Sequence, residues 1–365
     1  MTISDFTPET SHPSPAAMPR RRPDDVRNQT RTPAGSALIE TLNGPGSASV
    51  IIDGNYRRYF AKLTRVQLAV NAAVARQLPT IVRQAATTAT YQLEEFRLPS
   101  GPPMRIEAVP ILGPSNHAHG VYLHVGTRNL PPPVGTIEWD TRSGVAHLST
   151  AAATFLGIPP NERYSAQTLP ELISRIDRWD DLLGFLALFD TTPDIRRWAG
   201  TVTSANTDTH ERRHIYLAAA AATDRGPAVR AILYDISAAE PAPHPDLGSS
   251  ALRQIPTSHG HTIGMIDIKS WLVYDWIADG TPPISQWHHH NPEMHPEDTA
   301  TIGDCRRRLL TGTPTVSAAF RVRFSDNQEW CKVHCTWKSL PHGSDRPQAL
   351  LDIVPFTQSP HDRTE

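Results

Sequence analysis

Cysteine and lysine are both scarce in this chain of 365 residues. Its three cysteines, Cys305, Cys331 and Cys335, are too few for a disulfide framework. Cys331 and Cys335 lie four residues apart on an expected strand, which puts their Cα atoms roughly 13 Å apart, too far for a disulfide. We expect both to serve as small core residues. Only four lysines accompany 31 arginines, a bias typical of a GC-rich genome rather than of a function.

Long apolar runs and a strong net charge are also absent. No run approaches the roughly 20 apolar residues that cross a bilayer, and the N-terminus has no secretory hydrophobic segment. The formal net charge is -2, which gives no general attraction to nucleic acid or to an acidic membrane. We therefore expect a cytoplasmic protein that uses neither a membrane nor a nucleic acid as its partner.

The sequence also lacks the usual catalytic motifs. It has no GxSxG nucleophile turn, no GxxxxGK[ST] or GxGxxG phosphate loop, and no HExxH zinc motif. It has no kinase, cyclase or helix-turn-helix signature either. These absences exclude the common output domains and favour a protein that is not an enzyme.

Composition divides the chain into segments. The ends are rich in Pro, Thr, Ser and Arg, which predicts tails without a fold, and a Pro-rich stretch after the middle of the chain predicts a linker. The expected divisions are a tail at 1–34, a first unit at 35–130, a second unit at 131–238, a linker at 239–258, a third unit at 259–358 and a tail at 359–365.

The second and third units open and close alike. Residues 135–144 read GTIEWDTRSG and residues 264–269 read GMIDIK, so both begin with Gly-x-Ile followed by an acid. Both units end in an apolar run led by proline, from Pro227 and from Pro347. Repetition at this length indicates two copies of one small fold.

The sequences of the second and third units each predict two strands, then helices, then three strands. Gly144 suits a hairpin turn that needs a positive φ. Apolar residues recur at helical spacing from Leu169 to Leu186, and Gly312 is placed to end a helix in the third unit. The run YLAAAAA from Tyr216 is compatible with either a roomy cavity or a close interface.

This order of elements resembles a PAS domain, and two motifs carry the resemblance. Residues 294–302, MHPEDTATI, match the family's His-Pro-x-Asp helix start through His295 and Asp298. Residues 320–333, FRVRFSDNQEWCKV, match its hairpin motif, with Asn327 where Gly usually stands. Since Asp298 stands at a helix start, we expect its carboxylate to accept backbone N–H groups there.

The other two units depart further from the family. The second unit resembles it through residues 135–160, but IDRWDD at 176–181 stands where His-Pro-x-Asp is expected. The first unit matches only by the order and length of its elements. Together with the arginine bias, the resemblance indicates a tandem PAS sensory protein from an actinobacterium, without an attached output domain.

The resemblance implies an α+β fold of tandem PAS-like domains, each a curved antiparallel five-stranded sheet with short helices on one face. It implies a non-enzymatic sensory protein that binds a small ligand or a signalling protein and relays the event by conformational or oligomeric change. In such domains a ligand lies between sheet and helices, and an outer sheet face often makes a homodimer. The expected ligand-binding residues of the third unit are Trp276, Trp287, His290, Phe320 and Cys335.

Histidines give an alternative interpretation. His288, His290 and His295 lie close together in sequence, and imidazole is a common metal ligand, so a haem- or metal-binding redox or gas sensor stays open. The sequence itself requires no cofactor, with haem and flavin as the alternatives. A third interpretation is a structural adaptor that forms a homodimer.

Overall fold

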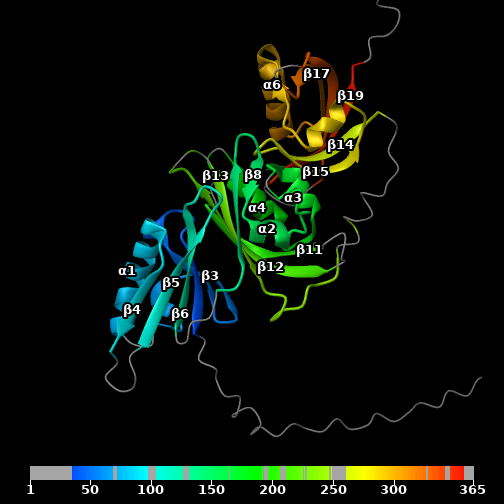
Figure 1. Cartoon of the computed structure of the whole chain (residues 1–365). Coiled ribbons are helices and arrows are strands. Elements are labelled where there is room, and N and C mark those ends of the chain that lie inside the picture. The colour runs from blue at the N-terminus through cyan, green and yellow to red at the C-terminus, as the bar shows by residue number, and fades with distance from the viewer. Residues whose placement is uncertain are drawn as a thin grey trace, which may run out of the picture. The chain divides into compact units, whose positions relative to one another are not determined.

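Three antiparallel sheets follow one another along the chain in the computed structural model (Figure 1). Residues Ala34–Glu365 group together by their contacts, so the boundaries between the three expected domains stay a prediction. Both predicted tails, most of the predicted linker and Asn327 lie outside the described residues. The structure describes residues 35–68, 72–97, 104–125, 131–163, 165–190, 192, 196–205, 211–224, 226, 228–245, 248, 260–325, 328–341 and 346–356.

The first sheet is covered by one long helix, α1. Buried apolar side chains, including Val74, Leu78 and Val82, recur along α1 at three- and four-residue spacing and face the sheet. Pro79 lies inside the helix without ending it. The elements are β1 (Ser36–Glu40), η2 (Pro45–Ser47), β2 (Ser49–Asp53), β3 (Tyr56–Ala61), η3 (Leu63–Arg65), α1 (Ala72–Thr88), β4 (Gln92–Phe96), β5 (Met104–Leu112) and β6 (Ala118–Val125).

The second sheet carries several short helices. The expected helical run from Leu169 to Leu186 is broken, because Ile176–Trp179 forms a short strand that pairs with β11. Asp181 then caps a new helix, accepting a hydrogen bond from Gly184 N at 2.9 Å. The elements are β7 (Val134–Asp140), β8 (Val145–Leu148), α2 (Thr150–Phe155), β9 (Gln167–Thr168), α3 (Leu169–Ser174), β10 (Ile176–Trp179), α4 (Leu182–Leu186), η4 (Ala187–Phe189), β11 (Arg197–Ala205), β12 (Arg212–Ala222) and β13 (Ala228–Asp235).

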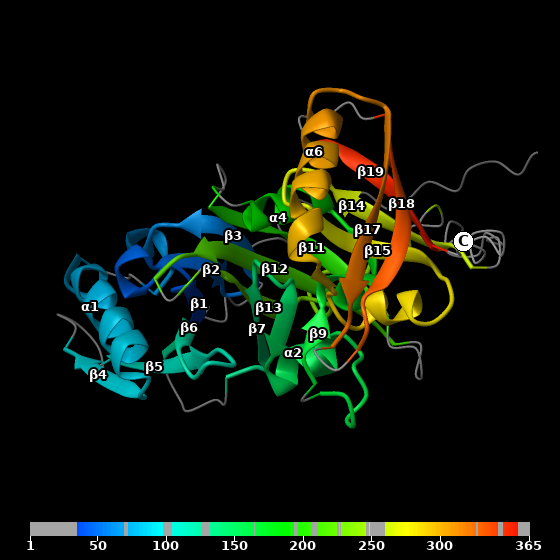
Figure 2. The same ribbon diagram turned by 90° about the horizontal axis from the view of Figure 1, so that it is seen from above.

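The third sheet is packed against α6, which lies along β17 (Figure 2). The predicted helix is present, and Gly312 follows it with φ 92°. The elements are β14 (Thr262–Asp267), β15 (Leu272–Asp279), η5 (Ile284–His288), β16 (Glu293–Met294), η6 (Pro296–Asp298), α6 (Thr299–Leu310), β17 (Thr315–Arg323), β18 (Cys331–Ser339) and β19 (Gln348–Pro355).

The three sheets share one strand order. In each, the first strand lies between the second strand and the last: β2-β1-β6, β8-β7-β13 and β15-β14-β19. The sheets have six, seven and six strands rather than the expected five. The additional strands, β3, β9, β10 and β16, lie at sheet edges, where a short segment can pair with one neighbour only.

The Ala-rich strand β12 lies in a close interface on both of its faces. Ala219 and Ala221 belong to the core that the second sheet forms with its helices. Ala218 and Ala220 belong to a second cluster that includes Leu38 and Tyr122 of the first sheet. Small side chains let both layers approach the strand closely, so of the two interpretations of YLAAAAA the interface is correct.

Candidate functional site

The predicted ligand-binding residues divide between a core and a cleft. Trp276, Trp287, Phe320 and Cys335 are 8%, 6%, 2% and 0% exposed and belong to the hydrophobic core of the third sheet. A ligand between sheet and helix would have to displace these side chains. His290 is exposed and lines a cleft outside that core, and Trp276 also borders this cleft. The structure therefore does not gather the five residues around one cavity.

The space between the second sheet and its helices is also filled. Trp139, Phe185 and Phe189 pack there edge to face, with ring centroids 5.5–6.1 Å apart. The cavity left among the apolar side chains of this core has a volume of about 10 Å³. That is about the space one water needs, so this core holds no ligand in the conformation observed.

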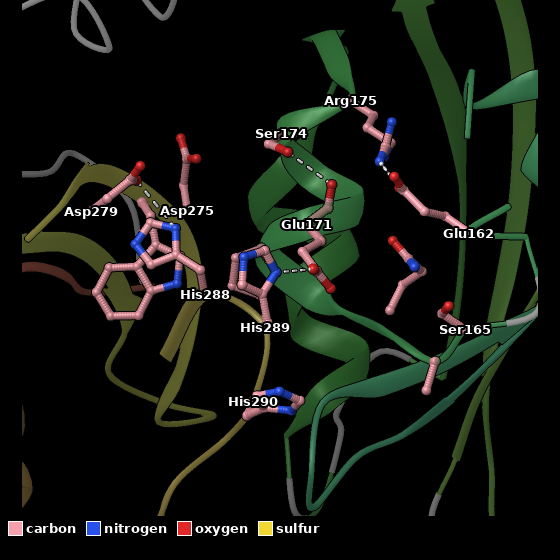
Figure 3. Close-up of a pocket in the computed structure, with 14 residues that line it drawn as sticks. Glu162, Ser165, Glu171, Ser174, Arg175, Asp275, Asp279, His288, His289 and His290 are labelled. Atoms are coloured by element: carbon pink, nitrogen blue, oxygen red, sulfur yellow. Dashed lines mark hydrogen bonds and ion pairs between the residues drawn. The ribbon is translucent and has the colours of Figure 1, made fainter. Parts of the chain in front are cut away.

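A polar cleft of about 590 Å³ lies between elements of the second and third sheets. We call it the junction cleft. One wall is α3 with the residues before it, and the other is β15 with η5 (Figure 3). Its lining is mostly charged or polar: Glu162, Ser165, Gln167, Glu171, Ser174, Arg175, Asp275, Asp279, His288, His289 and His290.

Local sequence fixes the position of Glu171 on the first wall. The hydroxyl of Thr168 accepts the backbone N–H of Glu171, and the Glu171 carboxylate accepts the backbone N–H of Thr168 at 2.6 Å. This is a capping box, and Pro170 in the first turn helps to start the helix. One Glu171 carboxylate oxygen is held by the backbone N–H of Thr168. The other oxygen points at the opposite wall (Figure 3).

Two polar contacts join the walls, beside the apolar packing of Tyr274 on α3. Nδ1 of His289 lies 2.6 Å from Oε1 of Glu171, and the Thr168 hydroxyl donates to the carbonyl oxygen of His288 at 2.8 Å. These contacts connect the first turn of α3 and its N-cap to His288 of η5 and to His289 after it.

His288 lies between an aromatic ring and a carboxylate in the junction cleft. Its ring stacks on Trp276, with centroids 4.9 Å apart and planes 17° apart, and its Nδ1 lies 3.3 Å from Asp279. Burial lowers the pKa of His288, and Asp279 offsets this only in part. Neither Nε2 of His288 nor Nε1 of Trp276 has a hydrogen-bond partner among the described residues, although both atoms are buried.

The histidines predicted as metal ligands have separate environments. His288 and His290 line the junction cleft, whereas His295 lies edge-on to Trp330, with ring centroids 4.7 Å apart. Within the described part of the chain, no group of three or more His, Cys, Asp or Glu side chains is arranged to hold a metal ion. All three cysteines are free thiols, and burial raises the pKa of each.

The residues of the two motifs at 294–302 and 320–333 contact one another. Both carboxylate oxygens of Asp298 bind the Arg321 guanidinium, at 2.9 and 3.0 Å, and this lowers the pKa of Asp298 to about 2. The backbone N–H that Asp298 accepts belongs to Arg321, not to the helix, so the expected helix cap is wrong in its partner. Arg323 lies over the Trp330 ring at 4.6 Å. These motif residues connect α6 to the β17–β18 hairpin.

Sequence reasoning missed the acidic residues of the junction cleft. Glu162, Asp275 and Asp279 stand in no motif and converge only because the second and third sheets meet there. Glu171 did carry a local signal, since Thr168-Leu-Pro-Glu171 is a capping-box sequence. That signal predicts a helix start and says nothing of a partner on another sheet.

One family model matches the chain, over residues 37–134, and its description is Rv3651-like, N-terminal. This region contains the first sheet and ends where β7 begins. No curated protein matches the chain. Among the described residues, no helix is both long enough and apolar enough to cross a membrane.

The chain is similar to a solved structure over most of its length. A crystal structure of a Mycobacterium tuberculosis protein, described only as uncharacterized, is 19% identical, covers 89% of this chain and 97% of that chain, and has a TM-score of 0.66. This likeness shows the fold alone.

Two further likenesses are distant. An RNA-binding light-oxygen-voltage receptor is 12% identical, over 61% of this chain and 96% of that one, with a TM-score of 0.24. The periplasmic sensory domain of the Campylobacter jejuni chemoreceptor Tlp1 is 9% identical, over 61% of this chain and 72% of that one, with a TM-score of 0.19. Both TM-scores are too low to carry an argument.

Proposed function

We propose that this chain is a non-enzymatic sensory protein of tandem PAS-like modules, which holds a small polar ligand in the junction cleft. The relay is a change in how the second and third modules pack on each other. The shared strand order of the three sheets supports the PAS-like assignment, since it is one arrangement repeated three times.

The observation that carries the proposal is the position of the cleft. Its side chains come from two modules, and Glu171 and Thr168 of one contact His289 and His288 of the other. The two modules can pack on each other in more than one arrangement. A ligand bound between them shifts the equilibrium toward the arrangement that it binds more tightly. The apolar core of the second module offers no comparable space.

The test is thermal unfolding of the full chain across a metabolite panel, beside native mass spectrometry of the protein as purified. We expect at least one small polar compound to raise the melting temperature of the wild type. Ala166→Trp, which places an indole at an exposed lining position of the cleft, should abolish that rise. Thr315→Trp on the exposed end of β17 is the matched control and should retain it.

Two outcomes would count against the proposal. One is that no compound stabilises the wild type and no ligand is retained after purification. The other is that stabilisation is equal in wild type and Ala166→Trp, because the ligand would then bind elsewhere.

A further inference from the structure

We propose that Trp271 is a gate at one end of the third module, and that the turn carrying it is coupled to the second module through Asp267. This role rests on the proposed function, because the relay named there is a change in how the second and third modules pack. Three observations carry it: two matching turns, the contacts of the Trp271 ring and the hydrogen bonds that Asp267 shares.

The second and third modules use the same turn between their first two strands. Asp140 begins one turn and Asp267 begins the other. In each, a serine three residues later donates its backbone N–H and its hydroxyl to that aspartate. The backbone N–H of the next residue donates to the aspartate carbonyl oxygen at 2.8 Å in both turns. The turns therefore share these three hydrogen bonds, and they differ in the residue that closes them.

The closing residue is Gly144 in the second module and Trp271 in the third. Gly144 has φ 65° and Trp271 has φ 63°, so both lie in the left-handed region. Glycine adopts this conformation freely, whereas a residue with a Cβ is crowded there. The third module therefore holds a bulky tryptophan in a strained backbone conformation where the matching turn uses glycine. Such residues persist only where the surrounding contacts compensate, and they gather at switch regions.

The ring of Trp271 makes the compensating contact. It packs at the edge of the third core on Trp337, with ring centroids 5.6 Å apart and planes 33° apart. Trp337 is 3% exposed, and its Nε1 is buried without a hydrogen-bond partner among the described residues. Packing of the rings favours the closed gate. Backbone strain and hydration of the unpaired donor favour release, so the turn meets the requirements of an element with two positions.

One carboxylate oxygen connects this turn to the second module. Oδ2 of Asp267 accepts the N–H and the hydroxyl of Ser270, and it also accepts from Arg346 at 2.6 Å. Arg346 in turn binds Asp190 at 2.9 Å and the carbonyl oxygen of Leu186 at 2.8 Å, both in the second module. Opening of the turn removes the serine donors from Oδ2 and so changes the carboxylate that Arg346 binds.

The experiment is hydrogen exchange of the full chain, followed by mass spectrometry and corrected for intrinsic rates. Trp271→Gly and Trp271→Ala both remove the ring, but only glycine takes the positive φ without strain. We expect the segment 267–273 to exchange on the order of fivefold faster in Trp271→Ala than in Trp271→Gly, because the strained turn opens more often. Both variants should exchange faster than the wild type over 331–339, since Trp337 loses its cover.

The second module gives the readout of coupling. The segment 182–190 contains both of the second-module partners of Arg346 named above, and it should exchange on the order of twofold faster in Trp271→Ala than in Trp271→Gly. The matching turn at 140–146 is the internal control and should exchange alike in the two variants. Phe356→Ala removes a 44% exposed ring of the third module, and this matched control should leave 182–190 at the wild-type rate.

Two outcomes would overturn this inference. Equal exchange of 267–273 in the two variants would show that Trp271 carries no strain, and the gate would be wrong. A difference at 267–273 without one at 182–190 would overturn the coupling to the second module. Both results leave the ligand cleft standing, because its own failure is the absence of any stabilising metabolite.

Discussion

At the scale of single residues, a contact between buried His119 and half-buried Glu138 joins the first and second sheets. His119 is 1% exposed, its Nε2 lies 2.8 Å from Oε1 of Glu138, and its Nδ1 lies 3.3 Å from the carbonyl oxygen of Ala231. Burial alone would raise the pKa of Glu138. Hydrogen bonds from His119 and Ser115, with the charges of His119 and Arg230, lower it to about 2.

This pair predicts acid sensitivity. The pKa of Glu138 falls from 4.5 unfolded to about 2 folded, so its stabilising contribution is complete above pH 4.5 and is lost as the pH falls toward 2. We expect Glu138→Gln to lower the free energy of unfolding at neutral pH by about 1–3 kcal/mol. The deficit should shrink below pH 4.5 in urea titrations. A deficit that is constant from pH 6 to about pH 3 would contradict the assignment.

The contact between His119 and Glu138 leaves no room for a side chain at Gly113. A Cβ at this position would overlap the His119 imidazole and approach the Glu138 carboxylate. Gly113→Ala should therefore destabilise the protein by about 1–3 kcal/mol, as overpacking of a closed site does. Gly46→Ala is the matched control, because a Cβ there meets nothing within 4 Å. Equal melting temperatures for the two variants would show that the pair tolerates displacement.

At the scale of elements, the junction between α3 and η5 should respond to pH through His288. Burial lowers its pKa below 6.5, so the unfolded chain takes up the proton first and stability falls as the pH drops through and below 6.5. Asp279, His289 and Glu171 are the titratable groups that act on the His288 ring. His288→Phe keeps the stack on Trp276 and should lose less stability than the wild type between pH 7 and about pH 5.

The measurement is chemical unfolding of both proteins at each pH. Exposed His147→Phe is the control, and its profile should follow that of the wild type. A profile for His288→Phe that runs parallel to the wild type would show that His288 does not couple folding to pH.

Elements with local signals could be predicted from the sequence. Gly144 turns the β7–β8 hairpin with φ 65°, and β18 alternates as expected, with Val333, Cys335 and Trp337 buried. The strand β10 could not be predicted, because its helical spacing is overridden by pairing with β11. The cleft likewise depends on contacts between sheets, which no local pattern specifies.

At the scale of the whole molecule, a buried cluster of charges joins the second and third sheets away from the cleft. Arg346 donates to Asp267 at 2.6 Å, to Asp190 at 2.9 Å and to the carbonyl oxygen of Leu186 at 2.8 Å. The Asp267 side chain is 0% exposed and also accepts from Gln348 at 2.8 Å. A charge buried this deeply is tolerated only while its partner is present.

Removing Arg346 should therefore weaken the molecule more than removing a surface charge. We expect Arg346→Leu to lower the free energy of unfolding by about 3–5 kcal/mol, because the buried Asp267 carboxylate is left without its counter-charge. Arg307→Leu is the control, since that side chain is 71% exposed and should change stability by less than about 0.5 kcal/mol. Similar denaturation midpoints for both variants would contradict the role given to the cluster.

The site of ligand binding is tested most directly by hydrogen exchange of the full chain, followed by mass spectrometry. The protein is incubated separately with cationic, anionic and neutral pools of small metabolites. The account predicts that one pool slows exchange in peptides covering 165–175 and 284–290, the two walls of the junction cleft. Protection confined to 315–323 and 331–339 would place the ligand between the third sheet and its helix instead, and no protection from any pool would contradict a ligand site altogether.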